Sequence, residues 1–600
     1  MSNPKALTWE EPGTPAELQS LLNEIGRFYP INKGTASGAI AVEFQKTGPE
    51  STVQVTVQGS HARIRYDRPY HAARGLGTLL SGLVQDGKPY LEHTPFETLG
   101  VMLDCSRNAV MTVEHFKGWL RQLALLGYNM AMLYTEETYE LPGEEYFGYL
   151  RGRYSPDELK EIDRYAASLN IEMVGCIQTL GHLEHVLKWP AYAQVWDTPT
   201  VMLVDEDATY RLIEKMIVQF SQSYGSRRIH LGMDEAHDLG RGNFMDRKGY
   251  QRSFDLFNRH LGRVVRICKK HGLKPMIWSD MYFRMGNASG NYYDPKTVIP
   301  EDVKKNIPAE ADLVYWDYYH DSESFYLDWI ERHRSLGKEP IVASGIWTWN
   351  QLWYNHPITQ KASVACIDAC RKSELKEIFF TMWGDNGAYC EFDSAFAGLA
   401  YCAEQAYASD HWDEKKLAAR FSAICGADYH AVLEASELNQ LGDPRNLMWD
   451  DPILNVEWKE RKKKDPDYWP NVVSKAKQMA KELSVHADTV APIDLAYALD
   501  AAEYLKRRTE LTLELEKSYL SNDKASLGEV RKLVPGIIES IDALLISLRR
   551  QWLRRNKPFG LEVLQQRFGG TKQRYLELDQ RLSELIAGEI GEIPELAQGL

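Results

Sequence analysis

TLGVMLDCS (residues 98–106) is an almost uninterrupted apolar run, and it is the first of eight such runs in the chain. An apolar run of this length is typical of a strand buried on both faces of a parallel sheet. The other seven runs are YNMAMLYT (128–135), IEMVGCIQ (171–178), RRIHLGMD (227–234), LKPMIWSD (273–280), ADLVYWD (311–317), EPIVASGIW (339–347) and KEIFFTMW (376–383). Helical patterns separate them, so residues 96–405 are predicted to form a (β/α)8 TIM barrel.

The segments between the predicted strands carry helix start and stop signals. Ser155-Pro156-Asp157-Glu158 has the pattern of a capping box, with proline at the first helical position. Gly127 stands where a helix C-terminal cap is expected after the first barrel helix. These signals support the alternation of strands and helices.

Two flanking regions have different patterns. Residues 1–95 are predicted to form a small α+β domain, because AIAVEF (39–44) and TVQVTVQG (52–59) alternate like half-buried strands and 73–85 has the pattern of a helix. Residues 406–600 lose the strand signal and are predicted to be mostly helical. One apolar stripe in this region has helical spacing: Ile538, Ile541, Leu545, Leu548 and Trp552. Two roles remain open for it, packing on the barrel and formation of a homodimer.

Composition limits the function classes. The 600-residue chain has 84 Asp and Glu against 70 Lys and Arg, a net charge of −14, which argues against a general nucleic-acid or anionic-membrane binder. No signal peptide is recognised, and no segment approaches the ~20 apolar residues of a membrane span. Eight scattered cysteines without a CxxC pattern predict reduced thiols and a cytoplasmic location. No cofactor or metal is predicted, because no glycine-rich phosphate loop is evident and Cys366 and Cys370 lack two further ligands nearby.

Polar and aromatic residues gather at the predicted strand ends, which form the active face of a TIM barrel. They are Asp104, Arg107, Glu136, Glu137, Gln178, His182, Asp234, Glu235, Trp278, Asp280, Trp316, Asp317, Tyr318, Trp347, Trp349, Trp383, Asp385 and Glu391. Pyranose rings stack on aromatic faces, and their hydroxyls need charged hydrogen-bond partners. The combination of carboxylates, one arginine and several indoles therefore predicts a sugar site.

Asp234 and Glu235 in HLGMDEAH (230–237) are the strongest catalytic candidates. Adjacent carboxylates at a strand end diverge, so they can serve two different atoms of one substrate. Indole walls can keep a carboxyl protonated near neutral pH, as a general acid requires. An Asp-Glu pair can also simply complement a helix dipole, but the surrounding indoles favour the catalytic interpretation.

Other residues near these positions are expected to be structural. His230 is expected to be a core histidine, and Tyr315 should point away from Trp316 into packing. Packing roles are also expected for the tryptophans away from strand ends: Trp329, Trp353, Trp412, Trp449, Trp458, Trp469 and Trp552.

At these motifs the sequence resembles glycoside hydrolase family 20, the β-N-acetylhexosaminidases. The resemblance rests on HLGMDE (230–235), LDCSRNAV (103–110), GHLEH (181–185), WSDM (278–281) and WGD (383–385). ARGLGTLLSGL (73–83) is similar to the end of the small domain that precedes the family's barrel. The resemblance covers roughly residues 1–405.

The resemblance implies an exo-acting enzyme that hydrolyses terminal β-linked GlcNAc or GalNAc without a protein nucleophile. In this scheme the substrate's own 2-acetamido oxygen attacks the anomeric carbon. Glu235 is implied as the acid/base and Asp234 as the residue that orients the acetamido group. The implied substrate contacts are Arg107 to O3 and O4, Asp385 or Glu391 to O4 or O6, and walls of Trp278, Trp316 and Trp383, with Trp347, His182 and Glu136 also expected at the site.

The sequence departs from the family pattern in places. ASGIWTWN (343–350) stands where the family usually has Tyr-x-Asp, so the hydroxyl for the acetamido carbonyl is assigned to Tyr318. Gln178 and Glu136 stand where aspartates are common, and the long helical C-terminus is not general to the family. These differences imply a divergent, intracellular, bacterial-type branch.

Two other functions remain open. One is a retaining glycosidase with a carboxylate nucleophile such as Asp280 or Asp317. The other is a non-catalytic sugar-binding barrel with the helical C-terminus as the active part.

Overall fold

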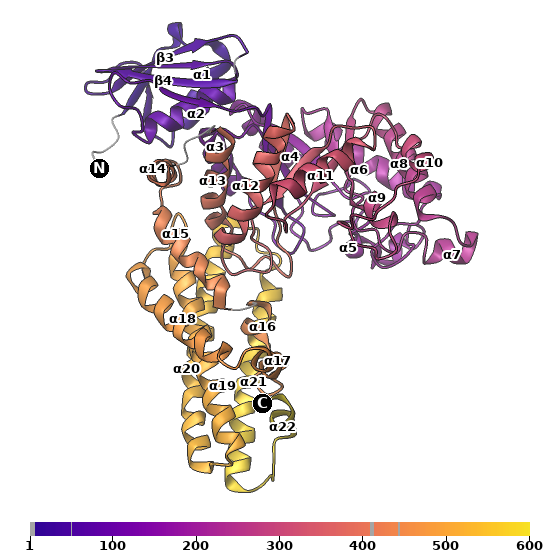
Figure 1. The fold of residues 1–600 in the computed structure, drawn as a ribbon, viewed down its shortest axis with the longest axis vertical. Helices are drawn as coiled ribbons and strands as arrows, with labels where there is room; N and C mark the ends of the chain where they lie inside the picture. Colours follow the sequence, from indigo (N-terminus) through magenta and orange to yellow (C-terminus); the bar gives the residue numbers. More distant parts are fainter. Residues whose placement is uncertain (1–5, 50, 408–412, 442–443) are drawn as a thin grey trace.

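The computed structural model describes residues 6–49, 51–407, 413–441 and 444–600. The chain consists of an N-terminal sheet domain, a closed eight-stranded barrel and a helical C-terminal region whose long helices project away from the barrel (Figure 1). This architecture confirms the predicted fold class.

The N-terminal domain is a six-stranded sheet with the order β2-β1-β3-β5-β4-β6. Its strands are β1 (Leu7–Trp9), β2 (Ile31–Lys33), β3 (Ile40–Lys46), β4 (Thr52–Gln58), β5 (His61–Tyr66) and β6 (Tyr90–His93), and its helices are α1 (Ala16–Ile25) and α2 (Pro69–Leu80). α2 packs closely on the sheet, because a Cβ at Gly75 would lie 2.7 Å from the Ile64 side chain. It begins earlier than expected because Pro69 occupies the first turn, where no backbone N–H is needed.

Eight parallel strands close the barrel, and the last strand pairs with the first. They are β7 (Thr98–Asp104), β8 (Met130–Tyr134), β9 (Glu172–Cys176), β10 (Arg228–His230), β11 (Lys274–Trp278), β12 (Asp312–Trp316), β13 (Ile341–Gly345) and β14 (Glu377–Met382). Each strand lies within one of the eight predicted runs, so all eight predictions are confirmed. β10 is much shorter than predicted, because the chain turns away from the barrel after His230.

Helices surround the barrel and connect its strands. They are α3 (Val113–Leu126), α4 (Pro156–Ser168), α5 (Glu184–Leu187), α6 (Asp207–Ser223), α7 (Asn243–Lys248), α8 (Ser253–Lys270), α9 (Asp280–Met285), α10 (Glu301–Lys305), α11 (Glu323–Arg334), α12 (His356–Lys372) and α13 (Phe396–Tyr407). The predicted capping box is present at α4, where the Ser155 side chain accepts from the Glu158 N–H and the Glu158 side chain accepts from the Ser155 N–H. Gly127 ends α3 in the left-handed conformation, as predicted.

The C-terminal region is almost entirely helical. It comprises α14 (Glu414–Cys425), α15 (Tyr429–Ala435), α16 (Pro444–Trp449), α17 (Trp458–Lys464), α18 (Tyr468–Leu483), α19 (Leu495–Leu520), α20 (Lys524–Arg555), α21 (Leu561–Ala587) and α22 (Pro594–Gly599). The predicted apolar stripe lies on α20 and packs within the chain: Ile541, Leu548 and Trp552 are buried, and Ile538 and Leu545 are partly buried. The homodimer stays a prediction.

The tryptophans predicted to pack do so where they are described. Trp329, Trp353, Trp458, Trp469 and Trp552 are buried, and Trp449 is partly buried against the same core. Trp412 lies outside the described residues.

Four buried charges join the three parts of the molecule. Arg74 of α2 contacts Glu92 of β6 and Glu404 of α13, with N–O distances of 2.6 and 2.7 Å. Arg420 of α14 contacts the same two carboxylates at 3.0 and 2.7 Å. This alternating ring of charges connects the N-terminal domain, the barrel and the first C-terminal helix.

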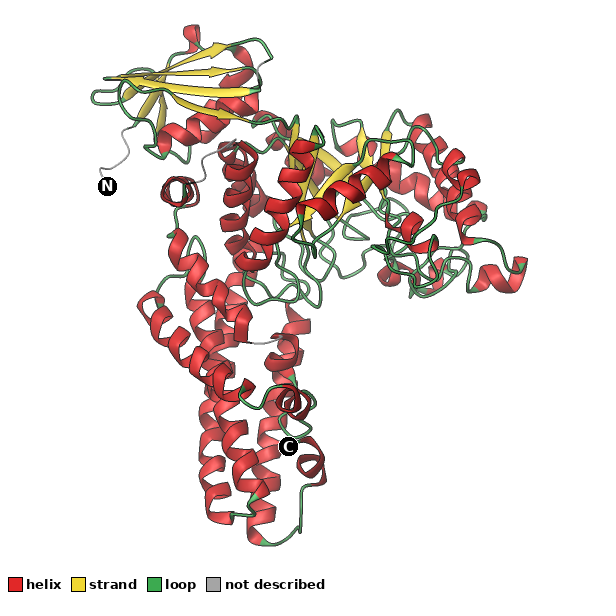
Figure 2. Cartoon of the chain, viewed as in Figure 1, coloured by secondary structure: helices red, strands yellow, loops and turns green. Residues whose placement is uncertain are grey.

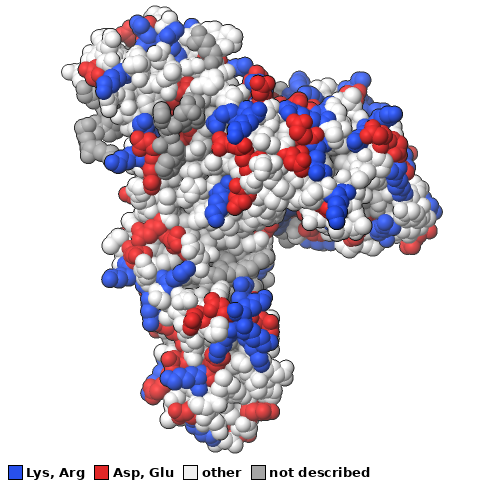
Figure 3. Space-filling view, viewed as in Figure 1, with Lys and Arg blue, Asp and Glu red and all other residues white. Residues whose placement is uncertain are grey.

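The surface carries charges of both signs, and the cysteines lie in the interior. Basic and acidic side chains are interspersed on the face drawn in Figure 3. All eight cysteines are buried and unpaired. Across the described part of the chain, every helix is too short or too polar to cross a lipid bilayer.

Candidate active site

A pocket of about 470 Å³ lies at the carboxyl ends of the barrel strands. Figure 2 shows that long loops gather on this side of the barrel, toward which the C-terminal helices project. The pocket is lined by Arg107, Asp234, Glu235, Trp278, Trp316, Tyr318, Tyr319, Trp349, Trp383 and Asp385.

A tight turn after β10 presents Asp234 and Glu235 to this pocket. Gly232, Met233 and Glu235 all have positive φ angles, of 68°, 71° and 47°. Gly232 has to be glycine, because a Cβ there would lie 2.0 Å from the Gln178 side chain. The Glu235 N–H donates to Asp280 Oδ2 at 3.1 Å, which holds this strained turn in place.

Asp234 is a buried carboxylate with two close partners. Gln178 Nε2 donates to Asp234 Oδ1 at 2.7 Å, and His182 Nε2 lies 3.2 Å from Oδ2. Burial by itself would raise the pKa of Asp234, but His182, Gln178 and Arg107 together lower that pKa to about 2. Asp234 is therefore anionic at neutral pH.

Glu235 is more open to solvent, with 36% of its side chain exposed. The Tyr292 hydroxyl donates to Glu235 Oε1 at 3.2 Å. Burial raises the pKa of the neighbouring Asp280 well above its usual value, and the Asp234 and Glu235 carboxylates raise it further. The two adjacent carboxylates, Asp234 and Glu235, thus occupy different environments in one pocket.

Arg107 also lines the pocket, where its guanidinium lies over two aromatic rings. Its guanidinium carbon is 4.8 Å from the Tyr134 ring centre and 5.0 Å from the Trp383 ring centre. Burial would lower the pKa of Arg107, but Tyr134 and the carboxylates of Glu136 and Asp104 raise it well above its usual value. Within the described part of the chain its Nη1 makes no hydrogen bond and lies 3.6 Å from Asp104 Oδ2.

Indoles and tyrosines form the walls of the pocket. Trp278 forms the floor, where it is 1% exposed and contacts His230 at a ring distance of 4.4 Å. Trp316 stacks on Tyr318 with ring centres 5.3 Å apart and planes 20° apart. Trp349 meets the Tyr318 ring edge-on at 5.3 Å.

The structure brings most of the predicted site residues to the pocket. Eight line it directly: Arg107, Asp234, Glu235, Trp278, Trp316, Tyr318, Trp383 and Asp385. His182 and Glu136 lie one layer behind, where His182 contacts Asp234 and Glu136 Oε1 lies 3.4 Å from Arg107 Nη2. Burial raises the pKa of Asp385.

Either Asp385 or Glu391 was predicted to hold O4 or O6, and the structure places Glu391 outside the pocket lining. Its side chain is completely buried, and its Oε1 accepts from Arg554 at 2.9 Å and from Arg555 at 3.4 Å. Both arginines belong to α20, so Glu391 faces the C-terminal helices instead of the pocket. Asp385 is the carboxylate of this loop that lines the pocket.

Trp347 was also predicted at the site, but it does not line the pocket. It stacks behind Trp349, with ring centres 4.0 Å apart, and contacts Tyr319 at 5.6 Å. The two indoles lie beyond the end of β13, where the alternation of a strand no longer decides which side chain faces inward.

Three residues outside the predicted site set contribute to it. Tyr319 and Trp349 line the pocket, and Tyr292 contacts Glu235. Trp349 stood among the strand-end candidates, and Tyr319 is adjacent to Tyr318. Tyr292 comes from a long loop after α9 and carried no sequence signal.

The expected structural residues are buried outside the pocket. Burial lowers the pKa of His230 to about 3, and His230 packs behind Trp278. Tyr315 points away from the pocket and stacks on His333 at 4.6 Å.

The two alternative nucleophiles do not line the pocket. Asp317 is fully buried and accepts hydrogen bonds from Tyr315 and His320 at 3.1 and 2.8 Å. Asp280 is 5% exposed and holds the Glu235 backbone.

Comparison with known families decides the classification. A family model described as "Glycosyl hydrolase family 20, catalytic domain" matches residues 129–389, and one described as "Glycoside Hydrolase 20C C-terminal domain" matches residues 421–600. The chain belongs to glycoside hydrolase family 20. Its barrel is therefore a glycoside hydrolase barrel. The helical C-terminus, which the resemblance left unexplained, matches a family 20 model of its own.

Individual relatives of this family 20 chain include two proteins named Hexosaminidase D. The Homo sapiens protein is 28% identical over 240 residues, which cover 38% of this chain and 46% of the relative. The Bos taurus protein is 28% identical over 202 residues, which cover 32% of this chain and 55% of the relative. The family 20 chain thus spans about half the length of these two proteins.

Solved structures share the fold at low identity. A GH20 exo β-N-acetylglucosaminidase from Vibrio harveyi, in complex with N-acetylglucosamine, is 16% identical, with 73% of this chain and 75% of that chain covered and a TM-score of 0.53. A GH20 β-N-acetylhexosaminidase from Streptomyces coelicolor A3(2) is 17% identical, with 71% and 93% covered and a TM-score of 0.51.

Proposed function

We propose that this family 20 chain is an exo-acting β-N-acetylhexosaminidase that releases terminal β-linked GlcNAc or GalNAc. The observation that carries the proposal is that Asp234 and Glu235, adjacent in the chain, face one pocket with indole walls and a buried floor. A pocket that ends on a buried indole suits the last sugar of a chain. Two relatives named Hexosaminidase D support the same activity.

Asp234 is suited to the acetamido N–H of the substrate. Its low pKa keeps it anionic, and the partners on both of its oxygens fix its direction. As the acetamido oxygen attacks the anomeric carbon, positive charge develops on the resulting oxazolinium ring. A fixed carboxylate beside the N–H stabilises that charge and is more effective than solvent, because it does not have to reorient.

Glu235 is the acid and base of the proposed cycle. In the first step its proton passes to the glycosidic oxygen as the bond from that oxygen to the anomeric carbon breaks. In the second step the resulting carboxylate takes a proton from water, whose oxygen attacks the anomeric carbon and opens the oxazolinium ring. Two inversions at one carbon retain the β configuration. The partial exposure of Glu235 is consistent with access of the leaving group and water.

The remaining pocket residues fit the sugar ring. Arg107 lines the pocket and its guanidinium supplies donors for O3 and O4, and Asp385 supplies an acceptor for O4 or O6. The pKa of Tyr318 is raised well above its usual value by burial, so its hydroxyl stays protonated and can donate to the acetamido carbonyl. Trp278, Trp316 and Trp383 supply apolar surface for the acetamido methyl group and the ring face.

Substitution of the two carboxylates tests the proposal. Glu235→Gln and Asp234→Asn should each lower kcat/KM for an aryl β-N-acetylglucosaminide by more than about 100-fold, because proton transfer or stabilisation of the oxazolinium is lost. Asp238→Asn is a matched control in the same segment, since Asp238 is exposed and outside the pocket lining. Full activity in either of the first two variants would exclude the assignment.

Two further measurements separate substrate assistance from a protein nucleophile. A thiazoline analogue of the oxazoline should inhibit strongly, and aryl β-glycosides without the 2-acetamido group should turn over far more slowly. A trapped covalent glycosyl-enzyme, or comparable turnover of a plain glucoside, would contradict substrate assistance. Calorimetry that detects sugar binding without any turnover would favour a non-catalytic barrel.

A further inference from the structure

Two pocket loops rest on the C-terminal helices. The β7 loop (residues 105–112) carries Arg107, and the β14 loop (residues 383–393) carries Trp383 and Asp385. Both contact the C-terminal corner (residues 554–567), which comprises the end of α20, the turn after it and the start of α21. This corner is more than 160 residues away in sequence from either loop.

The β14 loop is held by backbone contacts along much of its length. Arg567 of α21 donates to the carbonyl oxygen of Asn386, the residue after Asp385, at 2.5 Å. Arg555 Nη2 donates to the carbonyl oxygen of Cys390 at 3.1 Å. Tyr497 of α19 donates to the carbonyl oxygen of Tyr389 at 2.8 Å. Contacts to carbonyl oxygens fix the course of the backbone whatever the side chains are.

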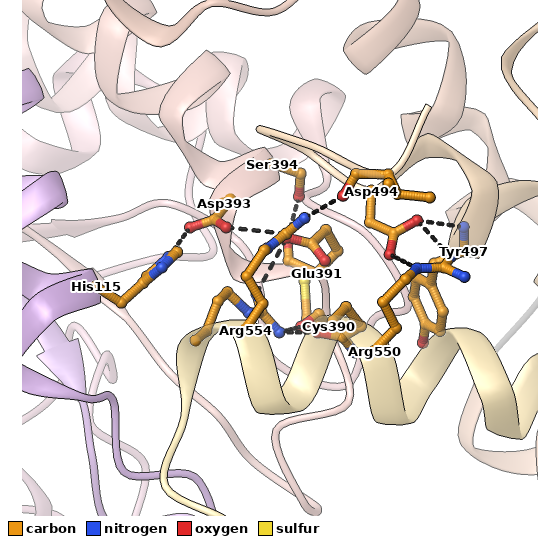
Figure 4. Close-up of polar contacts among 12 residues, drawn as sticks. His115, Cys390, Glu391, Asp393, Ser394, Asp494, Tyr497, Arg550 and Arg554 are labelled. Carbon is orange, nitrogen blue, oxygen red and sulfur yellow. Dashed lines mark hydrogen bonds and ion pairs between the residues drawn. The ribbon is translucent and has the colours of Figure 1, made fainter. Parts of the chain in front are cut away.

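A buried cluster of charges fixes the end of the same loop, as Figure 4 shows. Arg554 Nη2 donates to Glu391 Oε1 at 2.9 Å and to Asp393 Oδ2 at 3.1 Å. Asp393 also lies 2.8 Å from His115 Nε2 of α3. Buried ion pairs contribute little net stability compared with well-packed apolar residues, but they require one geometry. A cluster of this kind therefore favours a role in positioning the loop.

The β7 loop is held by the turn of the same corner. Asn108, next to Arg107, donates from Nδ2 to the Gly560 carbonyl oxygen at 2.7 Å and to the Gly387 carbonyl oxygen at 3.3 Å. Gly560 has to be glycine, because a Cβ there would lie 2.4 Å from the Asn108 carbonyl oxygen. The Lys557 N–H donates to the Val110 carbonyl oxygen at 2.8 Å.

The catalytic turn is held differently. Asp234 and Glu235 take their contacts from Gln178, His182, Asp280 and Tyr292, all of which belong to the barrel. The C-terminal corner thus supports the loops that carry Arg107 and Asp385, and the barrel itself supports the turn that carries Asp234 and Glu235.

We propose that the C-terminal corner is a positioning element of the sugar pocket, in which Arg555 and Arg567 set the place of Asp385 and the turn at residues 557–560 sets the place of Arg107. This inference rests on the proposed hexosaminidase function for its kinetic consequence. The corner positions residues that bind the ring hydroxyls of the sugar. These hydroxyls are bound equally in the enzyme–substrate complex and in the transition state. Loss of such uniform binding raises KM and leaves kcat nearly unchanged.

Arg555→Met is the main test variant, and Arg550→Met is its matched control. Arg550 lies on the same helix, and its ion pair with Asp494 stays within the C-terminal region. Arg555→Met should raise KM for an aryl β-N-acetylglucosaminide by about tenfold while kcat changes less than about twofold. Hydrogen exchange should accelerate in residues 383–393 and stay unchanged in residues 232–238.

Arg567→Ala keeps the proposal testable if Arg555→Met does not fold. Arg567 contacts the β14 loop through one backbone carbonyl oxygen, so the same split between KM and kcat should appear with a smaller rise in KM, of about threefold. Unchanged KM and unchanged exchange in the folded variants would overturn the inference, as would equal changes in Arg550→Met. A wild-type chain that cleaves no aryl hexosaminide would overturn the proposed function, and the exchange pattern would still decide this inference.

Discussion

The His182 imidazole lies 3.2 Å from the Asp234 carboxylate, and the backbone of Asp234 passes directly over the residue before this histidine. A Cβ at Gly181 would lie 2.7 Å from the Asp234 carbonyl oxygen, so only glycine allows this approach. The Gly-His segment and the Asp-Glu turn therefore form one packed unit. His182 acts as the fixed cationic partner of the carboxylate that is proposed to meet the acetamido group.

The pair of His182 and Asp234 predicts a loss of stability at alkaline pH. Burial would lower the pKa of His182, but Asp234 raises it to about 9 from the usual 6.5. The pKa of His182 is higher in the folded state than in the unfolded state. The ion pair therefore contributes fully to the free energy of unfolding below pH 6.5, and this contribution is lost as the pH rises through about 9. Its size is on the order of 3 kcal/mol.

Thermal unfolding of wild type and His182→Gln between pH 6 and 10 checks this prediction. Between pH 6.5 and 9 the thermal unfolding midpoint of the wild type should fall relative to that of the variant. Parallel pH profiles for the two proteins would show that His182 is not held protonated by Asp234.

Tyr318→Phe removes one hydroxyl from the pocket and should reduce turnover. The Tyr318 ring is held between Trp316 and Trp349, each with its ring centre 5.3 Å away. If the hydroxyl donates to the acetamido oxygen, kcat should fall by about 10- to 1000-fold with a smaller change in KM. Tyr319→Phe is the matched control, because Tyr319 lines the same pocket but is 58% exposed. Equal effects of the two variants would reject the assignment of Tyr318.

Asp385→Asn should weaken recognition of the sugar ring. Asp385 lines the pocket, and a charged hydrogen bond to a ring hydroxyl contributes about 1.5–3 kcal/mol. We expect kcat/KM for an aryl β-N-acetylglucosaminide to fall by about 10- to 100-fold. Asp321→Asn, an exposed aspartate after β12, should change it less than about twofold. Wild-type kinetics in Asp385→Asn would remove this residue from the site.

Trp349→Ala and Trp347→Ala distinguish a residue that contacts the ligand from a residue that packs behind it. Trp349 lines the pocket, and Trp347 stacks behind it at 4.0 Å. Loss of the wall should raise KM by about tenfold, because an aromatic contact of about 1.4 kcal/mol disappears. Trp347→Ala should raise KM by less than about threefold. The reverse order, measured under steady-state conditions, would show that Trp347 is the ligand contact.

Much of the barrel and of the site was predictable from local pattern. Runs such as 98–106 and 376–383 are apolar because both faces of a barrel strand are buried, and this leaves a signal in every segment. Asp234, Glu235 and Arg107 follow such strands directly, so their common location follows from the geometry of the barrel. Trp278 was predictable for the same reason.

The prediction failed where a long-range contact decides the environment. Glu391 follows a strand like Asp385 does, and its residue type is equally suited to a sugar. It faces Arg554 and Arg555, and nothing in residues 376–393 indicates that a helix about 160 residues later lies there. Tyr292 was missed because the loop that brings it to Glu235 has no periodic pattern.

The sequence by itself determined the eight-stranded barrel and its flanking regions, and it indicated that Asp234 and Glu235 lie together at one strand end. Burial on two faces and the direction of parallel strands are local properties that each segment records. Only the tertiary structure decided which side of the β14 loop faces a ligand and which faces the C-terminal helices. That choice depends on the docking of α20 and α21, and side-chain environments created by distant docking leave no pattern in the segments that they join.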